Sequence, residues 1–136
     1  MSGRQLLATL ALCLAVATSA PAQTSTEGRE AAEAWLALID SGEVGKSWDE
    51  ASTFFKEAIN REGWEAAVTQ ARGPLGPLSS RNYSGERRMT EMPNAPPGDY
   101  LVIQYASSFE ARKGLSEVVT MMVEDGQWKS VGYFVR

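Results

Sequence analysis

Glu117 is the residue whose type and position best suit chemistry. It lies in the segment Leu115–Val123, which is rich in β-branched and apolar residues and reads as a strand. Successive side chains of a strand point to opposite faces, so Glu117 shares its face with Leu115, Val119, Met121 and Val123. If that face is inward, burial raises the pKa of the Glu117 carboxyl toward neutrality, as a general acid or base requires.

Two interpretations of Glu117 follow from this position. In the first, Glu117 works with a tyrosine such as Tyr105 in proton transfer. In the second, it is structural, either turned to water or buried and paired, because buried charges normally have partners. Arginines that could pair with it are Arg81, Arg112 and Arg136. The structural interpretation is favoured, since perturbed carboxylates also arise in ion-pair networks.

Arg72 and Arg81 flank the segment Gly73–Pro77, whose sequence is Gly-Pro-Leu-Gly-Pro. Planar guanidinium groups suit carboxylate or phosphate ligands, and glycine N–H groups can also bind anions. The segment lacks the G-x-x-x-x-G-K-[ST] phosphate loop, and its prolines remove backbone donors. We therefore expect both arginines to pair with acidic neighbours where the helices give way to strands. Glu117, Tyr105, Arg72 and Arg81 are the candidate ligand-binding residues.

Composition excludes several kinds of site. The chain of 136 residues has no histidine and one cysteine, so a Ser-His-Asp triad and an internal disulfide framework are excluded. No calcium loop of the D-x-D-x-D-G type is present, and we predict neither a metal nor a cofactor. A formal net charge of −4 has the wrong sign for a nucleic-acid-binding protein. The acidic residues Asp40 and Asp49 are assigned to helix ends and solvated faces.

Residues 1–22 have the layout of a secretory signal peptide. Arg4 precedes the apolar run Leu6–Thr18, and Ala20-Pro21-Ala22 places a cleavage site after Ala22. An uncleaved membrane anchor is the alternative. A spanning helix needs about 20 apolar residues, and this apolar run is shorter. Lipidation at Cys13 is disfavoured, because Leu12 stands where a small residue is required. We expect a periplasmic or secreted protein with no membrane span and no cysteine after cleavage.

The remaining residues 23–136 predict one α+β domain. The first helix is capped by Thr24, Ser25 or Thr26 and ends at Asp40–Gly42. A second helix is expected to begin at Ser47, which forms the capping-box pattern with Glu50, and a third at Asn60. All four tryptophans are assigned to the core, because Trp35, Trp48 and Trp64 lie on apolar helical stripes and large aromatic side chains are usually buried. The fourth, Trp128, is in a predicted strand.

The second half of this domain predicts strands. Ser79–Met92 is polar and weakly alternating, which is typical of an edge strand, whereas Tyr100–Phe109 alternates well. Asp125-Gly126 is a hairpin signal that joins Leu115–Val123 to Trp128–Arg136. The expected fold is therefore three N-terminal helices packed on a curved antiparallel sheet of about four strands.

Several segments together resemble the bacterial family known as domain of unknown function 4019. They are Ala34–Gly42, Ser47-Trp48, Arg72–Gly76, Ser80-Arg81, Pro97–Tyr100, Asp125–Trp128 and Gly132–Phe134. The resemblance implies a small exported bacterial protein with a cystatin-like or nuclear-transport-factor-like topology. The family has no established activity, so the resemblance transfers no catalytic residue.

Three functional hypotheses remain. The leading one is a non-enzymatic periplasmic module that binds a small ligand or a protein partner on the concave face of the sheet. The second is a carboxylate-based enzyme that uses Glu117 in a cavity between sheet and helices. The third is an envelope assembly or inhibitor protein that acts through a sheet edge, with Ser79–Met92 as the candidate edge.

Overall fold

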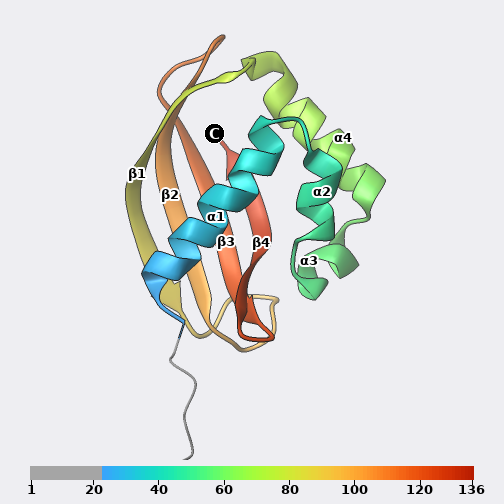
Figure 1. Cartoon of the computed structure of the whole chain (residues 1–136), viewed down its shortest axis with the longest axis vertical. Helices are drawn as coiled ribbons and strands as arrows, with labels where there is room; N and C mark the ends of the chain where they lie inside the picture. The colour runs from blue at the N-terminus through green and yellow to red at the C-terminus, as the bar shows by residue number, and fades with distance from the viewer. Residues whose placement is uncertain (1–22) are drawn as a thin grey trace, which may run out of the picture.

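A computed structural model of the chain describes residues 23–136. The predicted signal peptide over residues 1–22, with its cleavage site and Cys13, lies outside the described residues. Four α-helices and a short 3₁₀ helix precede four strands in the described part (Figure 1). In chain order the elements are α1 (Ser25–Asp40), α2 (Val44–Asp49), α3 (Thr53–Ala58), α4 (Arg61–Arg72), η1 (Gly73–Leu75), β1 (Leu78–Met89), β2 (Tyr100–Phe109), β3 (Leu115–Glu124) and β4 (Gln127–Val135).

The four strands form one antiparallel sheet in the order β1-β2-β3-β4. Each strand therefore pairs with its neighbour in sequence, and β1 and β4 are the edges. The turn between β3 and β4 is Asp125-Gly126, and both residues have positive φ (50° and 75°), as a two-residue hairpin turn requires. Irregularities in the β1–β2 register at Leu78/Ser80 and Tyr83/Gly85 interrupt the edge strand. The predicted α+β class is confirmed.

Helix α1 lies across one face of the sheet, and α2, α3 and α4 gather beside it toward β4 (Figure 1). Its N-terminus is closed by a capping box, in which the Thr24 side chain accepts from the Glu27 N–H and the Glu27 side chain accepts from the Thr24 N–H. Gly28 lets the helix approach β2, because a Cβ atom there would lie 2.6 Å from Leu101 Cδ2.

The segment predicted as one helix from Ser47 is two short helices, α2 and α3. The cap of α3 is Ser52, whose side chain accepts from the Phe55 N–H. Ser47 instead lies inside α2, where it is fully buried. Its hydroxyl donates to the Val44 carbonyl (2.6 Å) and accepts from the indole N–H of Trp64 (2.9 Å). The capping-box prediction at Ser47 was wrong because a long-range contact uses the hydroxyl.

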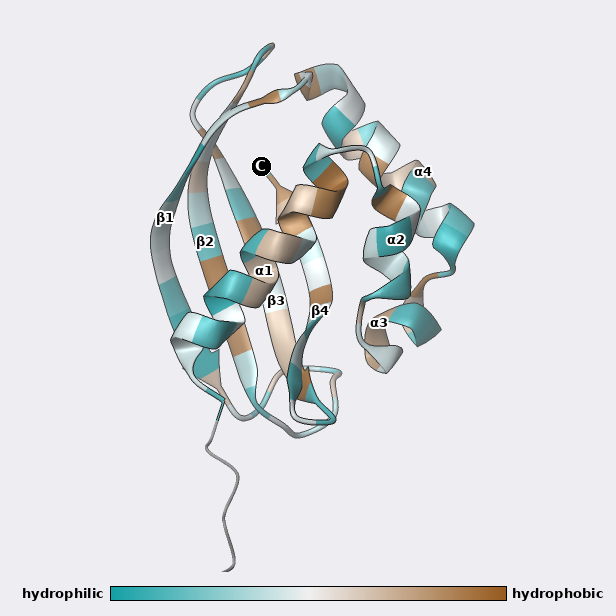
Figure 2. Cartoon of the chain, viewed as in Figure 1, coloured by the Kyte–Doolittle hydropathy of each residue, from teal (hydrophilic) through white to brown (hydrophobic). Residues whose placement is uncertain are grey.

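The core lies between the helices and the covered face of the sheet. Alternation along β2 directs Leu101, Ile103 and Tyr105 into it, and bands of polar and apolar colour mark this strand in Figure 2. Trp35 stacks on Trp64 with 5.7 Å between ring centroids. Trp35, Trp64 and Trp128 are buried, and Trp48 packs against the same cluster, so the core assignment of the tryptophans is confirmed. No helix within residues 23–136 has the length and apolar character needed to cross a membrane.

The role of Ser47 is testable in a double-mutant cycle. Ser47→Ala should lower the free energy of unfolding by about 1–3 kcal/mol, because it leaves the buried Trp64 N–H without an acceptor. In a Trp64→Phe background the same substitution should cost much less, since no N–H remains to be satisfied. Urea unfolding measures all four proteins. An equal cost of Ser47→Ala in both backgrounds would contradict this role and assign the cost to the hydrogen bond from Ser47 to the Val44 carbonyl.

Candidate functional site

Glu117 lies on the covered face of β3 and is completely buried. The guanidinium of Arg81, on β1, donates from Nε to Glu117 Oε1 (2.8 Å) and from Nη2 to Glu117 Oε2 (3.0 Å). The hydroxyls of Ser107 and Tyr133, on β2 and β4, also donate to the carboxylate. The other three strands thus each contribute a donor to the Glu117 carboxylate of β3. Of the orientations that the sequence left open for Glu117, the structure has the inward one, with the carboxylate buried and paired.

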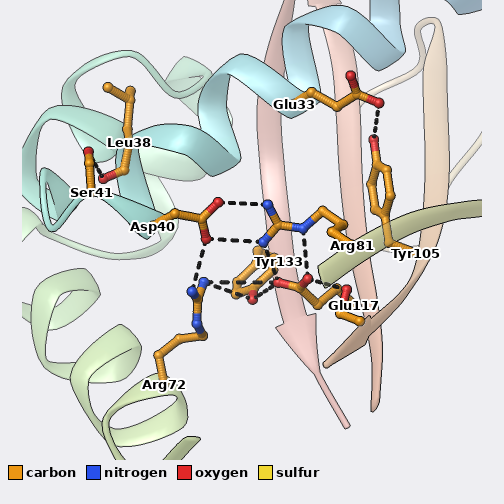
Figure 3. A network of polar contacts seen from close by, with 10 residues as sticks. Glu33, Leu38, Asp40, Ser41, Arg72, Arg81, Tyr105, Glu117 and Tyr133 are labelled. Carbon is orange, nitrogen blue, oxygen red and sulfur yellow. Dashed lines mark hydrogen bonds and ion pairs between the residues drawn. The ribbon is translucent and has the colours of Figure 1, made fainter. Parts of the chain in front are cut away.

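Asp40, the last residue of α1, joins this group to the helices. Its carboxylate accepts from Arg81 Nη1 (2.7 Å) and Nη2 (3.1 Å), so the Arg81 guanidinium lies between Asp40 and Glu117 (Figure 3). Arg72, at the end of α4, donates from Nη2 to Asp40 (2.9 Å) and has Nη1 3.9 Å from Glu117 Oε2. We call Asp40, Arg72, Arg81 and Glu117 the ion cluster.

The ion cluster balances its own charges. Two guanidinium groups face two carboxylates, and all four side chains are at most 21% exposed. The Arg72 guanidinium lies over the Phe109 ring, 4.7 Å from its centroid, and its buried Nε has no hydrogen-bond partner. The expectation that Arg72 and Arg81 pair with acidic residues at the helix-to-sheet crossing is confirmed.

The pKa of Glu117 is lowered, not raised as expected for a general acid or base. Burial opposes ionisation, but the hydrogen bonds from Arg81, Ser107 and Tyr133 and the charge of Arg81 outweigh it. The pKa of Asp40 is lowered in the same way, with burial outweighed by Arg81 and Arg72. Glu117 is therefore ionised at neutral pH and has no proton to donate, and its lone pairs are held by donors within the chain.

Tyr105 does not join the ion cluster. It lies opposite Glu117 in the β2–β3 register, but its hydroxyl donates to Glu33 Oε1 of α1 (3.5 Å). Burial raises its pKa, and the nearby Glu33 carboxylate adds to the rise. The proton-transfer pair of Glu117 and Tyr105 thus has no direct hydrogen bond. The ligand-binding role of the four candidates, Glu117, Tyr105, Arg72 and Arg81, stays a prediction.

The sequence did not indicate that Asp40 and Tyr133 surround Arg81 and Glu117. Asp40 is explained locally by its place at a helix end, and no motif relates Tyr133 to Glu117. Tyr133 also donates to Glu117, and burial together with the Glu117 charge raises its pKa. A signal for Asp40 did exist, since its carboxylate at the helix C-terminus opposes the helix dipole and so calls for a cationic partner. Arg112 and Arg136, the other proposed partners of Glu117, form no ion pair among residues 23–136.

A second feature lies on the opposite face of the sheet, which no helix of the described chain covers. A hollow of about 480 Å³ spans the four strands there. We call it the open-face hollow. It is lined by Gly85, Glu86, Arg87 and Met89 of β1, Val102 and Gln104 of β2, Val118 and Thr120 of β3, and by Phe134 and Arg136 at the end of the chain. None of the four sequence-predicted site residues lines it.

The open-face hollow has a partly apolar floor. Val118 is 8% exposed, whereas Phe134, its register partner on β4, is 48% exposed. The alternation that puts Glu117 on one face with Val119 also puts Val118 and Thr120 on the other face, which was the available signal for this site. Within residues 23–136 no three acidic side chains gather as a metal-binding group.

The fold and these two features define a class: an α+β protein whose antiparallel sheet has one face closed by helices and the other open. The sequence model of the family described as "Protein of unknown function (DUF4019)" matches residues 31–133. The chain therefore belongs to the DUF4019 family, and the resemblance noted in the sequence is confirmed. A search of curated proteins gives no match.

The ion cluster should be essential for stability. Glu117→Gln should lower the free energy of unfolding at pH 7 by about 3 kcal/mol, because it leaves buried guanidinium charge without a full partner. This is the low end of the usual cost, since Asp40 still faces both arginines. Glu33→Gln, which changes a carboxylate on exposed α1 surface, should stay within about 0.5 kcal/mol of wild type. Urea unfolding compares them, and a cost below 1 kcal/mol for Glu117→Gln would contradict this assignment.

The cluster also predicts how stability depends on pH. Because the folded-state pKa values of Glu117 and Asp40 lie below the ordinary 4.5 and 3.8, the unfolded chain binds more protons in that range. Stability should be constant near neutrality and fall as the pH drops below about 4.5. Urea unfolding from pH 7 to pH 3 measures the fall, which should be shallower in Glu117→Gln. Asp49→Asn, at a solvent-screened ion pair with Arg61, should change the profile less than Glu117→Gln does. An unchanged slope in Glu117→Gln would contradict the prediction.

Proposed function

We propose that this protein is a non-enzymatic, exported module that binds a small ligand in the open-face hollow. The observation that carries the proposal is a hollow of about 480 Å³ built by all four strands on the face that the helices leave open. Ligand sites in proteins commonly have volumes of about 300–1,000 Å³ and combine apolar walls with a few polar groups. The open-face hollow fits this description.

The covered face of the sheet is less suited to binding a ligand than the open face is. The expected concavity between sheet and helices is filled by the core, and Glu117 within it is completely buried. The Arg81 side chain, which separates Glu117 from Asp40, is 12% exposed. A ligand there would have to displace hydrogen bonds that the chain makes to itself, at a cost in stability. We therefore move the proposed ligand from the covered face to the open face.

The enzyme hypothesis has less support. A general acid must carry a proton near the working pH, and the lowered pKa of Glu117 leaves it ionised. A general base needs a free lone pair within reach of substrate, whereas Arg81, Ser107 and Tyr133 surround this carboxylate. The arrangement suits a structural charge better than a proton-transfer group.

The sheet-edge hypothesis also has less support. β1 is an edge strand, as expected, but its second half carries Glu86, Arg87 and Arg88 and follows the irregularity at Tyr83/Gly85. Charged residues and bulges are the features that protect natural sheet edges from pairing with another strand. Export to the periplasm or the medium is part of the proposal and rests on the signal-like residues 1–22.

Native mass spectrometry of the mature chain, residues 23–136, recovered from its export compartment tests the proposal. Wild-type protein should carry a reproducible small-molecule mass that is released on collisional activation. Thr120→Trp fills the open-face hollow from β3 and should reduce the occupied fraction at least tenfold. Asn82→Trp places the same side chain at an exposed β1 position outside the hollow and should retain the adduct.

Two outcomes would contradict the proposal. An adduct that persists in a folded Thr120→Trp protein would locate the ligand elsewhere. Wild-type protein recovered only with protein adducts would favour a partner-binding role. Circular dichroism and urea unfolding of both tryptophan variants establish that they are folded before their occupancies are compared.

A further inference from the structure

The open-face hollow carries positive side-chain charge that has no acidic side-chain partner among residues 23–136. Three ionisable side chains line it: Glu86, Arg87 and Arg136. Glu86 is already paired, because its Oε2 lies 3.1 Å from Arg29 Nε of α1. Arg87 and Arg136 form no ion pair within residues 23–136. The hollow therefore presents two guanidinium groups and no unpaired side-chain carboxylate.

The unpaired arginines are concentrated at the hollow, whereas most arginines of the described chain form ion pairs. Residues 23–136 contain eight arginines, and five of them form ion pairs: Arg29, Arg61, Arg72, Arg81 and Arg88. Of the other three, two line the open-face hollow, and the third is Arg112 on the β2–β3 loop. In a chain with a formal net charge of −4, a hollow with two unpaired cations is a local reversal of sign. A positive hollow attracts anions.

An apolar surface lies next to the charges. The register places Gly85, Gln104, Val118 and Phe134 in one row across the sheet. Gly85 leaves this row open, since no other heavy atom lies within 4 Å of a Cβ placed there. Phe134, 48% exposed, ends the row, and the Arg136 guanidinium lies 5.4 Å from the centroid of its ring. A flat apolar body thus fits between two cationic groups.

We propose that the open-face hollow is specific for an anionic amphipathic molecule, in which a carboxylate, sulfonate or phosphate is joined to an aromatic or short aliphatic body. This inference rests on the proposed function and adds the chemical class of the ligand. Arg87 and Arg136, which belong to opposite edges of the sheet, both attract the anionic group, and the guanidinium that the group reaches forms charge-assisted and bidentate hydrogen bonds to it. Val118 and Phe134 contact the apolar body.

The same residues have a simpler interpretation, which gives a different result. If Arg136 only covers the Phe134 ring and Arg87 only solubilises the edge strand, the hollow would bind neutral and anionic molecules of one shape equally well. The distinction therefore requires two probes that share a body and differ in charge. 8-Anilinonaphthalene-1-sulfonate is anionic, and N-phenyl-1-naphthylamine is its neutral counterpart without the sulfonate.

Fluorescence titration of the chain over residues 23–136 with each probe at low salt is the experiment. Wild type should bind the sulfonate at least tenfold more tightly than the neutral probe. At least one of the variants Arg87→Gln and Arg136→Gln should weaken sulfonate binding by about threefold to tenfold, as the loss of a partly exposed charged hydrogen bond predicts. Both should leave binding of the neutral probe within twofold. Arg112→Gln removes an arginine outside the hollow and should change neither titration.

Two variants that fill the hollow test whether the probes bind there. Thr120→Trp and Gly85→Leu fill the hollow from β3 and β1, and either one suffices if the other fails to fold. If a folded filling variant abolishes binding of both probes while the arginine variants change nothing, the anionic class is wrong and the proposed site stands. If both probes still bind, the hollow is not their site, which overturns the proposed site and the inference together. Absence of sulfonate binding to wild type overturns the inference alone.

Near-ultraviolet circular dichroism must match wild type in each variant, because this sulfonate also binds partly folded states.

Discussion

The guanidinium of Arg81, between Asp40 and Glu117, is the interaction on which the rest of the structure depends. It joins the end of α1 to β1 and β3 across sequence separations of 41 and 36 residues. Removing these charges from water is costly, so the arrangement persists only because hydrogen bonds satisfy the carboxylates almost completely. Arg72 adds α4 to the same point. The cluster thereby fixes how the helical layer sits on the sheet.

The ion cluster satisfies the charged groups of the covered face within the chain. Its donors and acceptors serve each other, and the lowered pKa values of Glu117 and Asp40 keep both carboxylates ionised. The open face has the opposite character. There Arg87 and Arg136 have no acidic partner in the described chain, and Phe134 is half-exposed. One sheet thus separates a neutralised, structural charge cluster from an accessible, positively charged hollow.

Local sequence predicted most of the elements because their signals are local. Asn60 caps α4 and Asp125-Gly126 forms the last turn, each through backbone contacts within a few residues. Alternation predicted the bounds of β2 and the side chains that share a face with Glu117. Prediction failed at Ser47, where the side chain is used by Trp64, 17 residues away. The local pattern there was correct for a cap, but a tertiary hydrogen bond displaced it.

The sequence alone determined that Glu117 shares a face with Val119 and Met121, that the residue before it and the residue after it face the other way, and that arginine is available to pair. It left open which of the two faces is inward. These conclusions depend on strand geometry and composition. Only the tertiary structure decided the sign of the Glu117 pKa shift, because burial raises this pKa and Arg81 lowers it, and the outcome depends on a distance of 2.8 Å between residues on different strands. The same holds for the open-face hollow, whose charge is positive because Arg29 neutralises Glu86 while Arg87 and Arg136 stay unpaired in the described chain. Local sequence specifies which face a side chain takes, and long-range packing specifies which charges meet there.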